Sequence, residues 1–115
     1  MSRAATADMN MGELQSRALR AAGLLKAMSN PVRLMVLCQL AEGEKSVGEL
    51  EKVVKTSQSA LSQHLAVLRE RGLVRARRAG QSIFYDLDGA EAPALLAALY
   101  EVYCRNVGKA RRARA

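Results

Sequence analysis

The sequence predicts a mainly helical domain with one small β-hairpin, in the order helix, helix, helix, helix, strand, strand, helix. Three observations predict this fold class. Apolar side chains recur at helical spacing through most of the chain, as in residues 12–29. The spacing changes to period 2 only between residues 73 and 87, where a glycine separates two short runs. A short helix, a polar turn and a longer helix come before that change, which is a helix-turn-helix arrangement.

The size and charge of the chain limit what it can be. Its 115 residues are enough for one domain with a single core. Eighteen Lys and Arg against eleven Asp and Glu give a net charge of +7, which indicates a polyanionic partner, either nucleic acid or an anionic membrane surface. No apolar run approaches the ~20 residues of a membrane span, and no signal-peptide pattern follows Met1. We therefore expect a cytoplasmic protein that does not insert into a membrane.

The first two helices are predicted by periodicity and by one capping signal. Residues 1–10 are polar and unpatterned, so we expect a disordered leader, a folded domain over 11–108 and a basic disordered tail over 109–115. The first helix covers residues 12–29. Asn30 then caps a second helix, which starts with Pro31 and reaches about residue 42. This second helix is apolar nearly all round, so it should be central.

The next two helices form the helix-turn-helix. Ser46 and Glu49 have the spacing of a capping box, which opens a third helix ending near residue 55. Ser57 is the expected cap of the fourth helix. In that helix Leu61, Leu65 and Leu68 form the apolar stripe of a buried face.

The opposite face of the fourth helix carries short uncharged side chains where a solvated helix normally carries Lys and Glu. They are Gln58, Ser59, Ser62 and Gln63. Such groups both donate and accept hydrogen bonds, and Gln can pair with adenine while Ser pairs with several bases. Thr56 and Ser57 are expected to contact phosphate. His64 has two open interpretations, a phosphate or base contact and a packed histidine without a role.

The period-2 segment predicts a hairpin of residues 73–78 and 82–87 with its turn at 79–81. An Arg-bearing hairpin after a helix-turn-helix is a wing, and Arg77, Arg78 and Gln81 can reach DNA from it. Asp88 and Glu91 have capping-box spacing and open a last helix that reaches about residue 107. The complete prediction is a winged helix-turn-helix.

The first and last helices carry more apolar side chains than the core of one domain needs. Pairing them with a second copy buries that surface and relates two reading helices by a two-fold axis. We therefore expect a homodimer that binds a pseudo-palindromic site on double-stranded DNA. The alternative is a slightly apolar monomer.

Cys38 and Cys104 lie on the second and last helices, which can touch in a domain this small. The residues alone favour two buried cysteines acting as small hydrophobes, and they leave open a reversible crosslink. One His and two Cys are too few for most closed metal sites, so no metal is expected. No nucleophile–base pair or phosphate-binding glycine loop is present, so we expect neither an enzyme nor a cofactor.

From about residue 14 to residue 107 the chain resembles the ArsR-type winged-helix repressors of bacteria. The runs that carry the resemblance are LKAMSNPVRL (25–34), SQSALSQHL (57–65), GLV (72–74) and the Arg-rich hairpin. Within that family it is similar to the persulfide-sensing branch, of the BigR, SqrR and YgaV type, with the HlyU regulators close by. Leu37-Cys38 and Tyr103-Cys104 carry this second likeness.

The resemblance implies a homodimeric repressor of sulfide-detoxification genes. It also implies that persulfides close a disulfide or polysulfide bridge between Cys38 and Cys104, which releases DNA. Two alternatives remain at this point. One is a repressor with inert thiols or another inducer, such as a general oxidant or a metal. The other is a winged-helix module for protein or RNA interaction.

Overall fold

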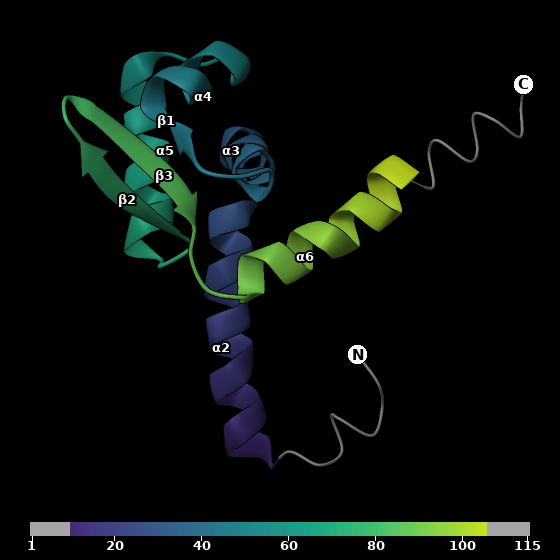
Figure 1. The fold of residues 1–115 in the computed structure, drawn as a ribbon. Helices are drawn as coiled ribbons and strands as arrows, with labels where there is room; N and C mark the ends of the chain where they lie inside the picture. Colours follow the sequence, from purple (N-terminus) through teal and green to yellow (C-terminus); the bar gives the residue numbers. More distant parts are fainter. Residues whose placement is uncertain (1–9, 106–115) are drawn as a thin grey trace, which may run out of the picture.

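The computed structural model describes residues 10–105. Its elements are α2 (Met11–Met28), α3 (Pro31–Ala41), β1 (Lys45–Ser46), α4 (Val47–Val53), α5 (Gln58–Glu70), β2 (Val74–Ala79), β3 (Ser82–Leu87), α6 (Glu91–Tyr100) and a π-helical turn η1 (Glu101–Arg105). The predicted order of helices and hairpin is confirmed (Figure 1). The predicted leader and tail lie outside the described residues, apart from Asn10.

Four helices begin where a short polar side chain accepts from one of their first amides, and three of these starts were predicted; the fourth is α2, where the Asn10 side chain accepts from the amide of Glu13 at 2.8 Å. The Asn30 carboxamide oxygen accepts from the amides of Val32 and Arg33, at 2.9 and 3.1 Å, and so starts α3. Ser46 and Glu49 form a complete capping box at α4. The Ser57 hydroxyl accepts from the amide of Ala60 at 3.1 Å and starts α5. These caps confirm the predicted starts because each depends on residues at most three positions apart.

The predicted capping box at the last helix is wrong. The N-cap of α6 is Ala90, and no side chain caps the helix. The amide of Asp88 donates to the carbonyl of Leu73 at 2.9 Å, which holds Asp88 at the end of the hairpin. Its carboxylate lies 3.9 Å from the guanidinium of Arg75. Tertiary contacts with the hairpin thus hold Asp88 where it makes no capping bond to the helix.

The last helix also differs from the prediction in its second half. Regular α-helix ends at Tyr100, and the chain continues as the π-helical turn η1, which contains Cys104. Residue 107, its expected end, lies outside the described residues. A π turn contains more residues than an α turn, so the side chains of η1 point in other directions than a continued α-helix would give them.

The sheet has one strand more than predicted. The strands are antiparallel in the order β1-β3-β2, and β1 pairs Lys45 with Tyr85 and Ser46 with Phe84. The β2–β3 hairpin pairs Val74 with Leu87 at its base and Ala79 with Ser82 at its tip, where Gly80 has a φ of 63°. A two-residue strand has too few residues to show period 2, which is why the pattern does not reveal β1.

The core gathers the apolar faces of the helices and of the hairpin base. Leu61, Leu65 and Leu68 of α5 are buried as predicted, together with Val36, Leu37 and Leu40 of α3. At the end of α4 Leu50 and Val54 are buried while Val53 is exposed. No helix among the described residues is long and apolar enough to cross a membrane.

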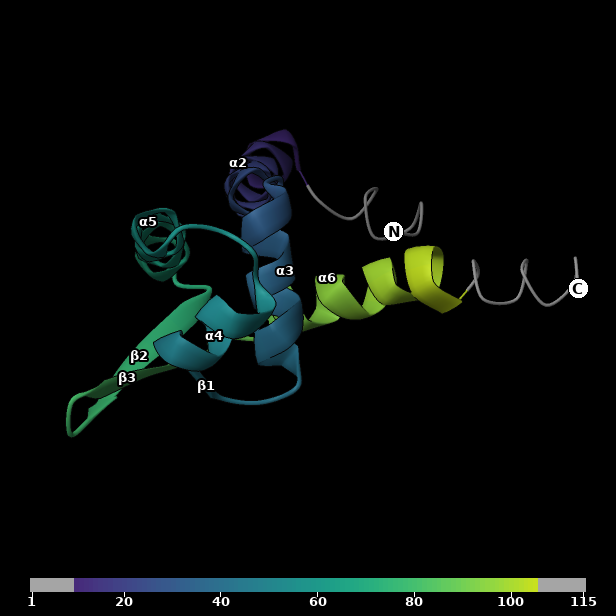
Figure 2. The ribbon, with the colours of Figure 1, turned by 90° about the horizontal axis from the view of Figure 1, so that it is seen from above.

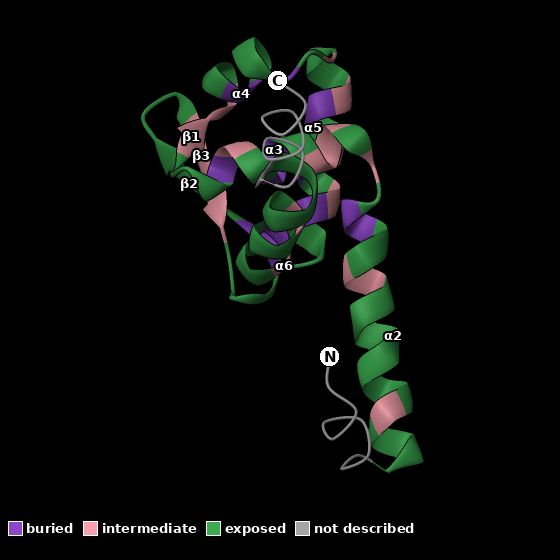
Figure 3. Cartoon of the chain, turned by 90° about the vertical axis from the view of Figure 1, so that its right-hand side faces the viewer, coloured by how far each residue is buried: buried purple, intermediate pink, exposed green. Residues whose placement is uncertain are grey.

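Helices α2 and α6 project from this body (Figure 1). Seen from above, the hairpin and α6 point to opposite sides of the helices (Figure 2). Most of α2 is exposed along its length (Figure 3). Its Leu19 and Leu25 are 70% and 55% exposed, and Tyr103 of η1 is 68% exposed. Leu25 and Tyr103 both line an apolar cavity of 590 Å³ between α2, α3 and the α6–η1 segment. The predicted surplus of apolar side chains is therefore uncovered in a single copy.

Candidate nucleic-acid interface and thiol pair

Helix α5 divides into a buried apolar face and an exposed polar face. The polar face carries Gln58, Ser59, Ser62 and Gln63, all exposed. The hydroxyl of Ser57 accepts the capping hydrogen bond of the helix, and the neighbouring Thr56 is half-buried. The leucine stripe thus fixes α5 to the core with its polar face directed outward.

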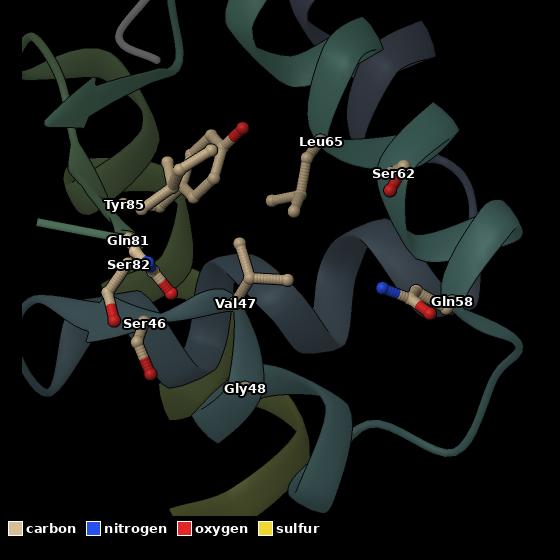
Figure 4. A pocket seen from close by; sticks show the side chains of 10 residues that line it. Ser46, Val47, Gly48, Gln58, Ser62, Leu65, Gln81, Ser82 and Tyr85 are labelled. Carbon is tan, nitrogen blue, oxygen red and sulfur yellow. The ribbon is translucent and has the colours of Figure 1, made fainter. Parts of the chain in front are cut away.

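A groove of 410 Å³ lies between α5, the start of α4 and the hairpin. Gln58 and Ser62 border it from α5, and Gln81 and Ser82 border it from the hairpin, with Val47 and Leu65 between the two sides (Figure 4). The groove therefore brings together three of the predicted DNA contacts from two elements. Ser59 and Gln63 are exposed on α5 outside its lining.

The groove also contains three residues that the sequence analysis did not predict to contact DNA. Ser46 and Gly48 contribute from the start of α4, and Ser82 contributes from β3. The position of Ser82 directly after Gln81 at the hairpin tip was a usable signal. For Ser46 and Gly48 no local signal existed, because only the folded sheet brings the start of α4 beside the hairpin.

The two neighbouring arginines of β2 have different surroundings. Arg77 donates two hydrogen bonds to the carboxylate of Glu44, from Nη2 to Oε1 at 2.6 Å and from Nε to Oε2 at 3.1 Å. Its guanidinium lies 4.8 Å from the centre of the Phe84 ring. The hydrogen bond from Arg77 lowers the pKa of the Glu44 carboxyl. Arg78 is exposed, and within residues 10–105 it forms no ion pair. Arg78 is thus available to phosphate, while Arg77 anchors the wing to the segment before β1.

His64 lies on the side of α5 that faces the other helices. It is half-buried, and its Nδ1 lies 3.3 Å from Nη1 of Arg33 on α3. It does not line the groove beside Gln58 and Ser62. Of the two interpretations left open by the sequence, this geometry favours a histidine held between helices.

The two cysteines come from different elements and line one cavity. Cys38 on α3 and Cys104 on η1 are both exposed, reduced thiols. The cavity measures 700 Å³, and its other walls include Leu40, Pro93 and Leu96. Partial burial of the Cys38 side chain raises the pKa of its thiol, and negative charge on Cys104 raises it further. Both thiols line the same cavity, and the expectation that the two cysteines are buried is wrong. That they react with each other stays a prediction.

The described residues contain no cluster of three or more His, Cys, Asp or Glu side chains that could hold a metal ion. Cys38 and Cys104 face an apolar cavity, and among the residues that the structure describes its only charged lining residues are Glu42 and Asp86. Each of these carboxylates lies near a basic side chain, Lys45 at 3.9 Å and Arg75 at 3.4 Å. The chemistry that this site offers is that of two neighbouring thiols.

The sequence and the fold of the chain are similar to those of several known proteins. Residues 30–76 match the family described as "Bacterial regulatory protein, arsR family". The chain is 48% identical over 99 residues to the transcriptional activator HlyU of Vibrio cholerae, covering 86% of this chain and 92% of HlyU. The crystal structure of the transcriptional repressor BigR from Xylella fastidiosa is 50% identical, with a TM-score of 0.77, over 84% of this chain and 98% of BigR.

A third comparison concerns assembly. A homodimeric winged helix-turn-helix DNA-binding domain from Mycobacterium bovis has a TM-score of 0.72 and 28% identity. The match covers 88% of this chain and 93% of that domain.

Proposed function

This chain belongs to the arsR family of bacterial regulatory proteins, and we propose that it is a homodimeric repressor whose two thiols sense reactive sulfur. Membership makes it a DNA-binding transcription regulator rather than an enzyme. The repressing action, the contact residues, the dimer, the cytoplasmic location and the inducer are our proposal. One observation carries the sensing part: Cys38 and Cys104 lie on different elements and line the same cavity.

The polar face of α5 is the proposed reader of bases. Gln58 and Ser62 share a groove with Gln81 of the wing, which supports a single DNA-facing surface built from both elements. Ser59 and Gln63 extend this surface along α5, with Thr56 and Ser57 near phosphate. Arg78 adds a phosphate contact from the wing. The net charge of +7 supports attraction to duplex DNA.

The proposed dimer pairs the domains of residues 11–108 through α2 and α6. The uncovered apolar side chains of both helices support it, and so does the homodimeric winged-helix neighbour from Mycobacterium bovis. A two-fold axis then presents two copies of α5 to successive turns of the duplex, about 34–36 Å apart. The expected DNA site is pseudo-palindromic for this reason.

The proposed sensing step is a sulfur transfer followed by ring closure. A cysteine thiolate attacks the terminal sulfur of an organic persulfide RSSH, forming Cys–S–SH and releasing RSH. The second thiolate attacks the cysteine sulfur of that persulfide, which forms Cys38–S–S–Cys104 and expels hydrosulfide. In total two thiols and RSSH give the disulfide, RSH and H₂S, so the two thiols supply the two electrons that reduce the persulfide. Further sulfane sulfur can lengthen the bridge.

The bridge acts on DNA binding through α3. Joining Cys38 to Cys104 ties α3 to the far end of the last helix, and α3 packs against α5 in the core. Bridging therefore favours a dimer in which the two copies of α5 are less well spaced. A loss of about ten- to a thousandfold in DNA affinity is enough to switch a promoter.

A DNA-binding titration of reduced and persulfide-treated protein at fixed salt tests the proposal. The probe is the best-binding duplex selected from a random library by the reduced protein. We expect persulfide to weaken binding of the unmodified protein and to leave Cys38→Ser and Cys104→Ser unchanged. Mass spectrometry should detect the Cys38–Cys104 crosslink in the treated sample. If Cys38→Ser still releases DNA, the thiol pair is not the sensor.

Three other outcomes separate the alternatives. Equal release by hydrogen peroxide indicates a general redox sensor. Binding that persulfide, oxidant and metals all leave unchanged indicates a regulator with inert thiols. Weak binding with no preference for palindromic duplexes, unaffected by changing Gln58 and Gln63, indicates a protein or RNA interaction module.

A further inference from the structure

Arg33 connects three helices with one side chain. It lies in the first turn of α3, where Asn30 caps its backbone amide. Its Nε donates to the carbonyl of Ala27 at 2.6 Å, and Nη2 lies 3.4 Å from the carbonyl of Lys26. Its Nη1 lies 3.3 Å from Nδ1 of His64 on α5. The side chain is half-buried, and no carboxylate within residues 10–105 forms an ion pair with it.

The chemistry of these contacts suits arginine and fixes the histidine. A guanidinium can only donate, so Nδ1 of His64 must accept and the ring proton must sit on Nε2. The carbonyls of Lys26 and Ala27 belong to the last turn of α2, where a cation is favourable. The planar fork of Arg reaches all three acceptors at once, whereas the ammonium of Lys is a single point donor.

The contact between Arg33 and His64 is directional, unlike the rest of the α3–α5 interface. Apolar packing of Val36 and Leu37 with Leu61 and Leu65 holds the two helices together in the shared core. The hydrophobic effect is not directional, whereas a hydrogen bond fixes the relative position of two named atoms. Among the side-chain hydrogen bonds of residues 10–105, the Arg33–His64 bond alone joins α3 to α5. His64 follows directly after Gln63 on the DNA-facing helix.

We propose that Arg33 is a positioning residue for DNA recognition, which sets the rotation of α5 through Nδ1 of His64. The inference rests on the proposed role of α5 as the reading helix and not on the thiol chemistry. Arg33 and Cys38 lie on the same helix. A movement of α3 caused by a change at Cys38 therefore also moves Arg33, and with it the hydrogen bond that positions α5. Arg33 thereby joins the helix that carries Cys38 to the reading helix.

A double-mutant cycle on reduced protein tests the proposal, with the library-selected duplex as the probe. Arg33→Lys and His64→Leu should each lower affinity about tenfold, and the double variant should lose no more than either single one. His64→Asn should bind within about threefold of the unmodified protein. The carboxamide oxygen of Asn occupies nearly the position of Nδ1, while Asn offers nothing in place of Nε2. Arg20→Lys is the matched control, because Arg20 pairs with Glu91 at 3.4 Å away from α5.

The outcomes separate a failure of the positioning role of Arg33 from a failure of the reading role of α5. Additive losses, or a His64→Asn variant as weak as His64→Leu, overturn the positioning role and indicate a direct contact through Nε2. A Gln58→Ala, Gln63→Ala variant that binds normally overturns the reading role of α5 instead. Thermal unfolding of every variant separates a failure to fold from a failure to bind. If Arg33→Lys does not fold, the comparison of His64→Asn with His64→Leu decides alone.

Discussion

Neighbouring residues of β2 are expected to contribute to DNA binding in different ways. Arg78 is free to reach a phosphate, while Glu44 and the Phe84 ring hold Arg77. Arg78→Ala should reduce the slope of log affinity against log salt by about 0.9 for each phosphate that the protein no longer neutralises, or about 1.8 in a dimer. Arg77→Ala should leave that slope nearly unchanged while it loosens the wing. Titrations at several salt concentrations measure both, and equal slope changes in the two variants would contradict the assignment.

The thiol of Cys38 should react as a weaker acid than an ordinary cysteine. Partial burial raises its pKa, and negative charge on Cys104 raises it further, so the thiolate is scarce at neutral pH. The alkylation rate of Cys38 should keep rising with pH beyond the ordinary midpoint of about 8.5. Cys104→Ser should shift the midpoint down only in part, because burial is the larger cause.

Mass spectrometry of iodoacetamide-treated protein across a pH series gives the Cys38 profile. The same protein in urea supplies the reference, since unfolding removes both causes of the shift. A midpoint in the folded protein at or below the urea value would contradict the raised pKa.

The contact partners and the exposure of individual site residues were predicted least well from the sequence. The exposed Gln and Ser face of α5 followed from helical periodicity alone. The partner of Arg77 did not, because Glu44 stands 33 positions away and meets it only across the folded sheet. The partner of His64 is 31 positions away on another helix. The exposure of the thiols was likewise hidden, since it depends on how the last helix leaves the body.

At the scale of elements, the cap of α3 offers a stability test. The Asn30 side chain satisfies two amides at the start of the central helix. Asn30→Ala should lower the free energy of unfolding by about 1 kcal/mol, while Asn30→Asp, which keeps an acceptor, should cost only a fraction of that. Urea denaturation followed by circular dichroism measures both. Equal decreases in the free energy of unfolding of the two variants would show that the capping hydrogen bonds do not stabilise the helix.

The elements that the sequence predicted correctly share one property: each is determined by residues that are close together in the chain. The caps at Asn30, Ser46 and Ser57 depend on residues within one helical turn. Strand β1 depends on pairing with β3, and the failure of the Asp88 cap depends on a bond to Leu73. The π turn at Cys104 interrupts a periodicity that reads as unbroken helix. Features fixed by partners elsewhere in the chain were the ones that the pattern missed.

At the scale of the whole molecule, the exposed faces of α2 and α6 predict dimerisation. Leu25→Glu places a charge in the apolar cavity between these helices and should raise the dimer dissociation constant at least about tenfold. Val53→Glu is the matched control, because Val53 is 46% exposed but lies on α4. Sedimentation equilibrium measures the change. A Leu25→Glu protein that remains as dimeric as the control would place the interface elsewhere.

The uncovered arms formed by α2 and the last helix also affect how a promoter responds to copy number. If two chains must pair before either reading helix meets its half-site, occupancy at low concentration scales with the square of the monomer concentration. Halving the number of chains in the cell then lowers occupancy about fourfold, so modest changes in expression or turnover act as a second input beside any inducer. The leucines that are exposed in a single copy thus make promoter occupancy depend more steeply on protein concentration than it would for a monomeric regulator.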